Sequence, residues 1–142
     1  MTGTYSHRVR YDETGGLGAA HYARICGWFD AAQQELLRAD GFSYGTLEAR
    51  GLGFAVVDVH LSIRCPARCD EQITVKTTLR ERKYFRFVFH HEIFGEDGRN
   101  IAVGDVCSVL VNREMRPVNM AKALPEAYEA YGRYLESAEA SK

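Results

Sequence analysis

Residues 20–39 read AHYARICGWFDAAQQELLRA, and the spacing of their apolar side chains predicts one long amphipathic helix. These side chains recur at intervals of three and four residues, which gathers them on one helical face. They are Tyr22, Ile25, Cys26, Phe29, Ala32, Leu36 and Leu37. Polar residues such as Asp30 and Gln33 fall mostly elsewhere, and Asp40 and Gly41 end the helix. Such a helix needs an apolar surface to cover its buried face.

Beyond a polar connection over 42–51, the apolar period changes from 3.6 to two, which is typical of strands. The sequence Glu-Asp-Gly-Arg at 96–99 predicts a hairpin, because Gly98 accepts the positive φ that such turns require. A shorter helix is expected at 125–135, with a frayed tail from Ser137. The predicted strands are 5–11, 57–63, 73–79, 85–93 and 101–112.

The chain of 142 residues is long enough for one domain with a substantial core, so we expect a single domain over 1–142. One strand precedes the helix and four follow it. No second βαβ unit is present to suggest a parallel sheet. The predicted fold class is therefore α+β, with one curved sheet covering one long helix.

Charge and composition exclude several kinds of partner. The net charge is −1 with both signs interspersed, which gives no basic block for nucleic acid. No apolar run approaches the ~20 residues that cross a bilayer, and the first residues lack the apolar core of a secretory signal. The four cysteines are few for a disulfide scaffold, and Cys65 and Cys69 lack the paired spacing of structural zinc sites. We expect a cytoplasmic protein without metal, cofactor or membrane partner.

Residues 12–18, DETGGLG, form a glycine-rich turn that leads from the first strand into the helix. Gly18 removes a Cβ that would obstruct a close approach to the backbone. The N–H groups near His21 and Tyr22 lie at the helix start, where unsatisfied donors and the helix dipole favour negative charge. The turn therefore indicates an oxyanion site, and a plain tight turn is the alternative.

This turn resembles the front motif of the single hotdog-fold thioesterases of the 4-hydroxybenzoyl-CoA thioesterase type. The helical sequence that begins at Trp28, the turn at Pro66 and the Arg-Pro pair at Arg116 continue the resemblance over roughly 6–117. It implies a hotdog fold, in which a five-stranded antiparallel sheet wraps around the central helix. It also implies pairing into a homodimer or tetramer, with active sites at the dimer interface.

One position departs from this family. The family's catalytic carboxylate falls at position 15, where this chain has Gly15. By the resemblance, the Tyr22 N–H beside Gly18 is the principal oxyanion donor. Thioester hydrolysis also needs a group that supplies or orients water, for which the candidates are His21 and, from a facing strand, His60. Each histidine also has a structural reading, His21 as a cap or surface residue and His60 as an interface residue.

Two acidic residues precede the glycines. Asp12 and Glu13 are interpreted as helix caps or solvent-facing side chains, and a displaced catalytic carboxylate is the alternative.

Two further sets of residues are candidates for substrate binding, although ordinary core packing and solvated strand ends also explain them. The candidates for the acyl group are Trp28, Phe29, Tyr44, Phe54 and Val56. The candidates for pantetheine or phosphate are Arg64, Arg68, Lys83, Arg86 and Arg116.

The predicted function is hydrolysis of an acyl thioester, carried by coenzyme A or by an acyl carrier protein, in polyketide- or fatty-acid-derived secondary metabolism. A second hypothesis is addition of glycine or another amine to an α,β-unsaturated thioester before hydrolysis. A third is a non-catalytic acyl-binding protein that lost its activity with the carboxylate.

Overall fold

The computed structural model describes residues 1–136, so the expected frayed tail from Ser137 lies outside the described residues. All strand pairs are antiparallel, in the order β1-β3-β4-β5-β2, which confirms the predicted α+β class and five-stranded sheet. The strands are β1 (Gly3–Arg8), β2 (Gly53–Ile63), β3 (Gln72–Arg82), β4 (Arg86–Phe94) and β5 (Asn100–Val111). The helices are α1 (Tyr22–Ala39), α2 (Tyr44–Ala49), α3 (Met120–Ala123) and α4 (Pro125–Gly132), and the 3-10 turns are η1 (Tyr11–Glu13) and η2 (Gly16–Gly18).

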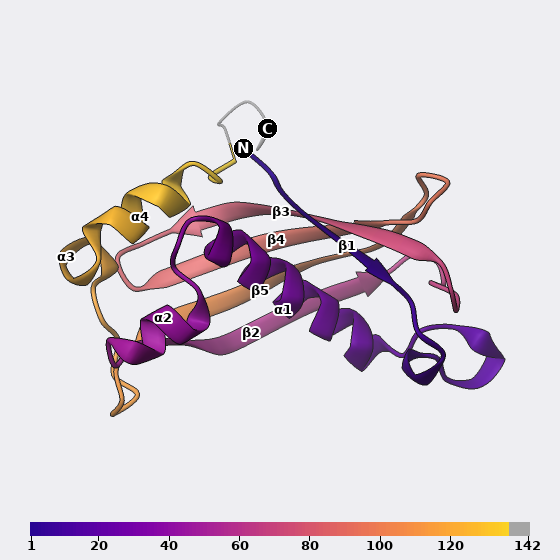
Figure 1. Ribbon diagram of the computed structural model, residues 1–142, viewed down its shortest axis with the longest axis horizontal. Helices are drawn as coiled ribbons and strands as arrows, with labels where there is room; N and C mark the ends of the chain where they lie inside the picture. The colour runs from indigo at the N-terminus through magenta and orange to yellow at the C-terminus, as the bar shows by residue number, and fades with distance from the viewer. Residues whose placement is uncertain (137–142) are drawn as a thin grey trace.

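Helix α1 lies across one face of the sheet (Figure 1). Its buried residues are Ile25, Trp28, Phe29, Ala32, Gln33, Leu36 and Leu37. The ring of Phe29 stacks on the ring of His91 in β4, with the centroids 4.8 Å apart. On β5, a Cβ added to Gly104 would stand 2.6 Å from Cε2 of Phe29, so the glycine lets the helix approach the sheet closely.

Several predicted boundaries and faces were wrong in detail. Gln33 belongs to the buried face, at 1% exposure, because its Nε2 donates to the Tyr44 hydroxyl at 3.3 Å. The Tyr22 side chain is 61% exposed, because no other described element covers the first residue of α1. The short helices α2 and α3 were not predicted, and α4 ends at Gly132 rather than at 135.

The predicted hairpin is confirmed between β4 and β5. Gly98 has a φ of 85°, and the N–H of Gly95 donates to the carbonyl of Arg99 at 3.0 Å. The hairpin therefore closes through the positive φ that glycine tolerates. Within residues 1–136, no helix is long and apolar enough to cross a membrane.

Strand β2 forms one edge of the sheet and pairs only with β5 among the described strands. A register shift between Val56 and Asp58 marks a bulge. Val57, Val59 and Ile63 are 61%, 45% and 49% exposed, so this long edge carries apolar side chains on its surface. Exposed apolar edges of this kind are open to pairing with another strand.

Candidate active site

The glycine-rich turn is closed at its base by backbone contacts. Thr14 forms a β-bridge with Ala20, and the N–H of His21 donates to the carbonyl of Glu13 at 3.0 Å. The N–H of Ala20 also donates to the carbonyl of Ala67, at 2.8 Å, which ties the turn to the segment after β2. The base of the turn is therefore held from two sides.

The tip of the turn adopts left-handed backbone conformations. Leu17 has a φ of 68° and Gly18 a φ of 73°. The side chain of Leu17 is almost fully exposed, at 97%. Gly18 thus has the positive φ that glycine accepts without the steric cost of a Cβ.

The first residue of α1 presents a free N–H. His21 caps the helix: its Nδ1 accepts from the N–H of Ala23 at 3.2 Å, and its carbonyl accepts from the N–H of Arg24 at 2.9 Å. Within the described residues, no acceptor is bonded to the N–H of Tyr22. Of the helix-start donors, this N–H is therefore the one available to a ligand.

The cap also defines the state of the His21 ring. Because Nδ1 accepts a hydrogen bond, the neutral ring carries its proton on Nε2. The side chain is exposed. In this tautomer, His21 offers a second donor near the Tyr22 N–H rather than a free base.

Gly15 leaves open space at the position where the sequence resemblance predicts a carboxylate in the family. Its φ of −108° is extended backbone that any residue adopts, and an added Cβ would meet no atom within 4 Å. The two preceding acids do not fill that space. Asp12 forms an exposed ion pair with Arg10 at 3.1 Å, and Glu13 turns into the core.

For Glu13 the solvent-facing interpretation was wrong, whereas the cap interpretation holds for η1, where the carboxylate accepts the N–H of the N-cap residue Arg10. Glu13 is 6% exposed rather than solvent-facing. Its carboxylate accepts hydrogen bonds from Nε2 of His7 at 2.7 Å, the N–H of Arg10 at 2.9 Å and Nε1 of Trp28 at 2.8 Å. Burial alone would raise the pKa of Glu13, but these hydrogen bonds outweigh it and hold the pKa below its ordinary value. The signal in the sequence was Trp28, whose indole N–H needs an acceptor when buried.

His60 does not lie with the front turn in this chain. In the strand register it stands opposite Asp105 of β5, which stands opposite His90 of β4. Asp105 and His90 are bonded at 2.8 Å. Gly104, the residue before Asp105, faces α1. Because successive residues of a strand point to opposite faces, His60, Asp105 and His90 lie on the face of the sheet away from α1.

The five acyl candidates occupy different places. Trp28 points to Glu13 near β1, and Phe29 packs on His91. Tyr44 and Phe54 are half-buried, with ring centroids 6.3 Å apart, and pack against a separate part of the core. Val56 is 53% exposed on the β2 edge. Within the described part of one chain, these residues are therefore divided between two core clusters and the β2 edge.

The five cationic candidates are all exposed, and they divide between opposite ends of the sheet. Arg64 follows β2, and Arg68 bridges to Ala19 in the front turn. At the other end, Lys83 precedes β4, Arg86 begins it, and Arg116 lies in the turn after β5. Strands of 11 or 12 residues separate the ends by roughly 30 Å. Within one chain, the second group is therefore far from the front turn.

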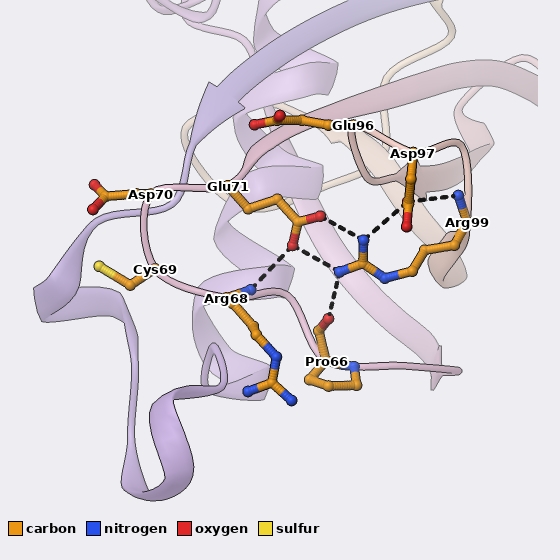
Figure 2. Close-up of a pocket in the computed structure, with 8 residues that line it drawn as sticks. All are labelled: Pro66, Arg68, Cys69, Asp70, Glu71, Glu96, Asp97 and Arg99. Carbon is orange, nitrogen blue, oxygen red and sulfur yellow. Dashed lines mark hydrogen bonds and ion pairs between the residues drawn. The ribbon is translucent and has the colours of Figure 1, made fainter.

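A hollow of about 620 Å³ lies at the front-turn end of the sheet (Figure 2). Glu71 holds both terminal nitrogens of Arg99, at 2.6 and 2.7 Å, and Arg99 also donates to Asp97 at 3.0 Å. The guanidinium of Arg68 points away from this pair in Figure 2. The lining residues are Pro66, Arg68, Cys69, Asp70, Glu71, Glu96, Asp97 and Arg99. The lining contains two arginines and four acidic residues, so the hollow is negative overall and disfavours phosphate.

A family model for the thioesterase-like superfamily matches residues 9–136. The chain belongs to this superfamily. The match spans the front turn, α1 and strands β2 to β5, and it begins directly after β1. The predicted thioester hydrolase class is thereby confirmed at the level of the family.

Relatives of this superfamily member agree in sequence and fold. The acyl-CoA thioester hydrolase YbgC of Escherichia coli O6:H1 is 27% identical over 124 residues, covering 87% of this chain and 90% of YbgC. The DHNA-CoA thioesterase structure from Staphylococcus aureus has a TM-score of 0.88 and 25% identity, covering 93% of this chain and 89% of that one. Protein TT1821 of Thermus thermophilus has a TM-score of 0.86 and 28% identity, covering 96% and 100%. The hotdog fold is confirmed.

Proposed function

We propose that this protein hydrolyses acyl-CoA thioesters, with the Tyr22 N–H as the principal oxyanion donor. The observation that carries the proposal is this free N–H at the start of an 18-residue helix, beside the tight turn at Gly18. When water attacks the thioester carbonyl, negative charge develops on the carbonyl oxygen. A fixed backbone donor and the positive end of the helix dipole both stabilise that charge.

His21 supplies a second donor in the proposed mechanism. Its protonated Nε2 lies on the residue next to Tyr22 and is free of the capping bond that Nδ1 makes. It can hydrogen-bond to the carbonyl oxygen and share the charge that develops there. Water attacks the carbonyl carbon, the C–S bond breaks, and the proton lost by the water passes to the leaving thiolate, which releases the acid and the thiol. Because Gly15 brings no carboxylate, this route depends on the donors more than on a base.

The proposed active unit is a homodimer that pairs through β2. The edge is unpaired in the described chain and exposes Val57, Val59 and Ile63. Two β2 strands that pair antiparallel about a two-fold axis bring opposite ends of the two sheets together. The cations at the far end, Lys83 and Arg86 among them, then approach the front turn of the partner. This arrangement would add these cations to Arg64 and Arg68, which lie at the front-turn end of the same chain.

The carrier is proposed to be coenzyme A because relatives named for CoA thioesters cover most of this chain. An acyl carrier protein presents the same phosphopantetheine, which makes it the second substrate to test. The expectation of a role in secondary metabolism remains a prediction.

A thiol-release assay tests the function. Aliphatic, aromatic and unsaturated acyl groups are offered on CoA and on a phosphopantetheinylated carrier protein, and free thiol is measured with a thiol reagent. We expect release from CoA thioesters. Intact thioesters across the whole panel would refute hydrolysis. With crotonyl-CoA and glycine, mass spectrometry of the product distinguishes the free acid from an amine adduct, which would favour the amine-addition hypothesis.

A further inference from the structure

The buried carboxylate of Glu13 joins three parts of the chain that are distant in sequence. His7 lies in β1, Arg10 directly precedes the η1 turn, and Trp28 lies in the second turn of α1. The three donors approach within 2.7 to 2.9 Å, and the carboxylate is shielded from solvent. The ring of His7 also packs on that of Trp28, with centroids 5.3 Å apart. One side chain therefore sets the distance between β1 and the start of α1.

The backbone of the same residue holds the helix start. The carbonyl of Glu13 accepts the N–H of His21, directly before the free N–H of Tyr22. The next residue, Thr14, bridges to Ala20. A shift of Glu13 would therefore move the residues that precede Tyr22, and with them the direction of its N–H.

Glu13 itself is not placed to act as a base. Its Oε1 accepts from His7 and Arg10, and its Oε2 accepts from Trp28. A buried carboxylate that already accepts three hydrogen bonds from the protein is poorly placed to hold a water that must reach a substrate. Its contribution to catalysis is geometric.

We propose that Glu13 is a positioning residue that aims the Tyr22 N–H at the thioester oxyanion. This inference rests on the proposed function, since it assigns a support to the same oxyanion site. Small errors in the placement of a catalytic donor reduce the rate strongly, even when the substrate still binds.

The test compares Glu13→Gln with the wild-type protein. Glutamine keeps the length of the side chain but replaces one acceptor oxygen by an NH₂ group, which cannot accept from its facing donor. We expect kcat to fall by about 10- to 100-fold with KM changed by less than about twofold. The reason is that a misdirected Tyr22 N–H weakens the hydrogen bond to the oxyanion, which forms only in the transition state. In ¹⁵N-labelled protein, the amide resonance of Tyr22 should shift.

Asp105→Asn is the matched control. It makes the same change from carboxylate to amide. The Asp105 carboxylate is likewise hydrogen-bonded to other side chains, those of His90 and Arg80. Asp105 lies on the face of the sheet away from α1. We expect its variant to keep the wild-type kcat and the wild-type Tyr22 resonance.

A folded Glu13→Gln variant with wild-type kcat and an unmoved Tyr22 resonance would overturn the inference, as would a rise in KM alone. If this variant does not fold, Trp28→Phe removes one donor and leaves the carboxylate, and the same two outcomes apply. If the wild-type protein releases no thiol from any thioester, the proposed function fails. The Tyr22 resonance in the variant then still decides whether Glu13 positions this N–H.

Discussion

His91 makes the stability of this protein depend on pH. Its imidazole is fully buried on the inner face of β4, where Nδ1 is bonded to Oγ1 of Thr77 at 2.8 Å and the ring stacks on Phe29. Its Nε2 has no partner within the described residues. Burial lowers the pKa of His91 to about 3, with a smaller decrease from His90 and an opposing effect of Asp105. The ring is therefore neutral in the folded protein near neutral pH.

The direction and size of the effect follow from proton linkage. In the unfolded chain, a histidine titrates near pH ~6.5. Between that pH and about 3, the unfolded state binds one more proton at this position than the folded state does. The free energy of unfolding therefore falls as the pH drops through this window, by about 1.4 kcal/mol per pH unit. The loss is roughly 2 kcal/mol at pH ~5 and approaches about 5 kcal/mol below pH ~3.

The measurement is urea unfolding of the wild-type protein and His91→Phe at pH ~7.5 and pH ~5, at one protein concentration. Phenylalanine keeps an aromatic ring against Phe29 but does not titrate. Carboxylates whose pKa values are lowered by folding, such as Glu13 and Glu71, also destabilise the fold on acidification. They are common to both proteins and cancel in the comparison.

We expect the wild-type protein to lose about 2 kcal/mol more than His91→Phe between the two pH values. The absolute stability of the variant does not enter this comparison, although the Thr77 hydroxyl loses its partner. If both proteins lose the same free energy, the fold does not hold His91 in the neutral state.

Three further predictions concern the front turn and the β2 edge. Gly15→Asp fits the open space and the extended φ at that position, so we expect kcat/KM for acyl-CoA to rise by about 100-fold. The control is Gly16→Asp, whose added Cβ also meets no atom within 4 Å and which should leave kcat/KM unchanged. Equal rates for the two variants in a thiol-release assay would contradict this prediction. Gly18→Ala places a Cβ at a φ of 73°, so the free energy of unfolding measured with a chemical denaturant should fall by about 1 to 2 kcal/mol, and kcat should fall with it. An unchanged free energy of unfolding would show that the turn relaxes. Val59→Lys puts a charge on the exposed apolar edge of β2, so sedimentation velocity should show monomers in place of dimers. Persistence of the dimer would exclude this edge as the interface.

Local patterns were sufficient to predict most of the elements. The helix face from Ile25 to Leu37 follows a 3.6-residue period, and the inner face of β3 follows a period of two. The hairpin follows from one glycine, Gly98. These features depend on neighbours within a few residues, so they are readable along the chain. The four-residue helix α3 escaped prediction because a helix that short carries no complete period.

The environment of individual site residues was decided by contacts between distant segments. Glu13 is buried because His7 and Trp28 bring donors to its carboxylate from β1 and α1. Gln33 is buried because Tyr44 supplies a partner for its amide. In both cases a polar residue enters the core only when another element satisfies it, and sequence spacing does not record that partner.

For function, the sequence alone determined the glycine-rich turn, the helix that follows it, the presence of glycine rather than an acid at position 15, and the family resemblance. The tertiary structure decided that the Tyr22 N–H has no acceptor within residues 1–136 and that Nδ1 of His21 is occupied by the cap, which puts the proton of the neutral ring on Nε2. It also decided that His60 lies on the opposite face of the sheet. The physical reason is that residue types and their order are local properties, whereas the direction of a donor and the face of a side chain depend on how distant segments pack and pair.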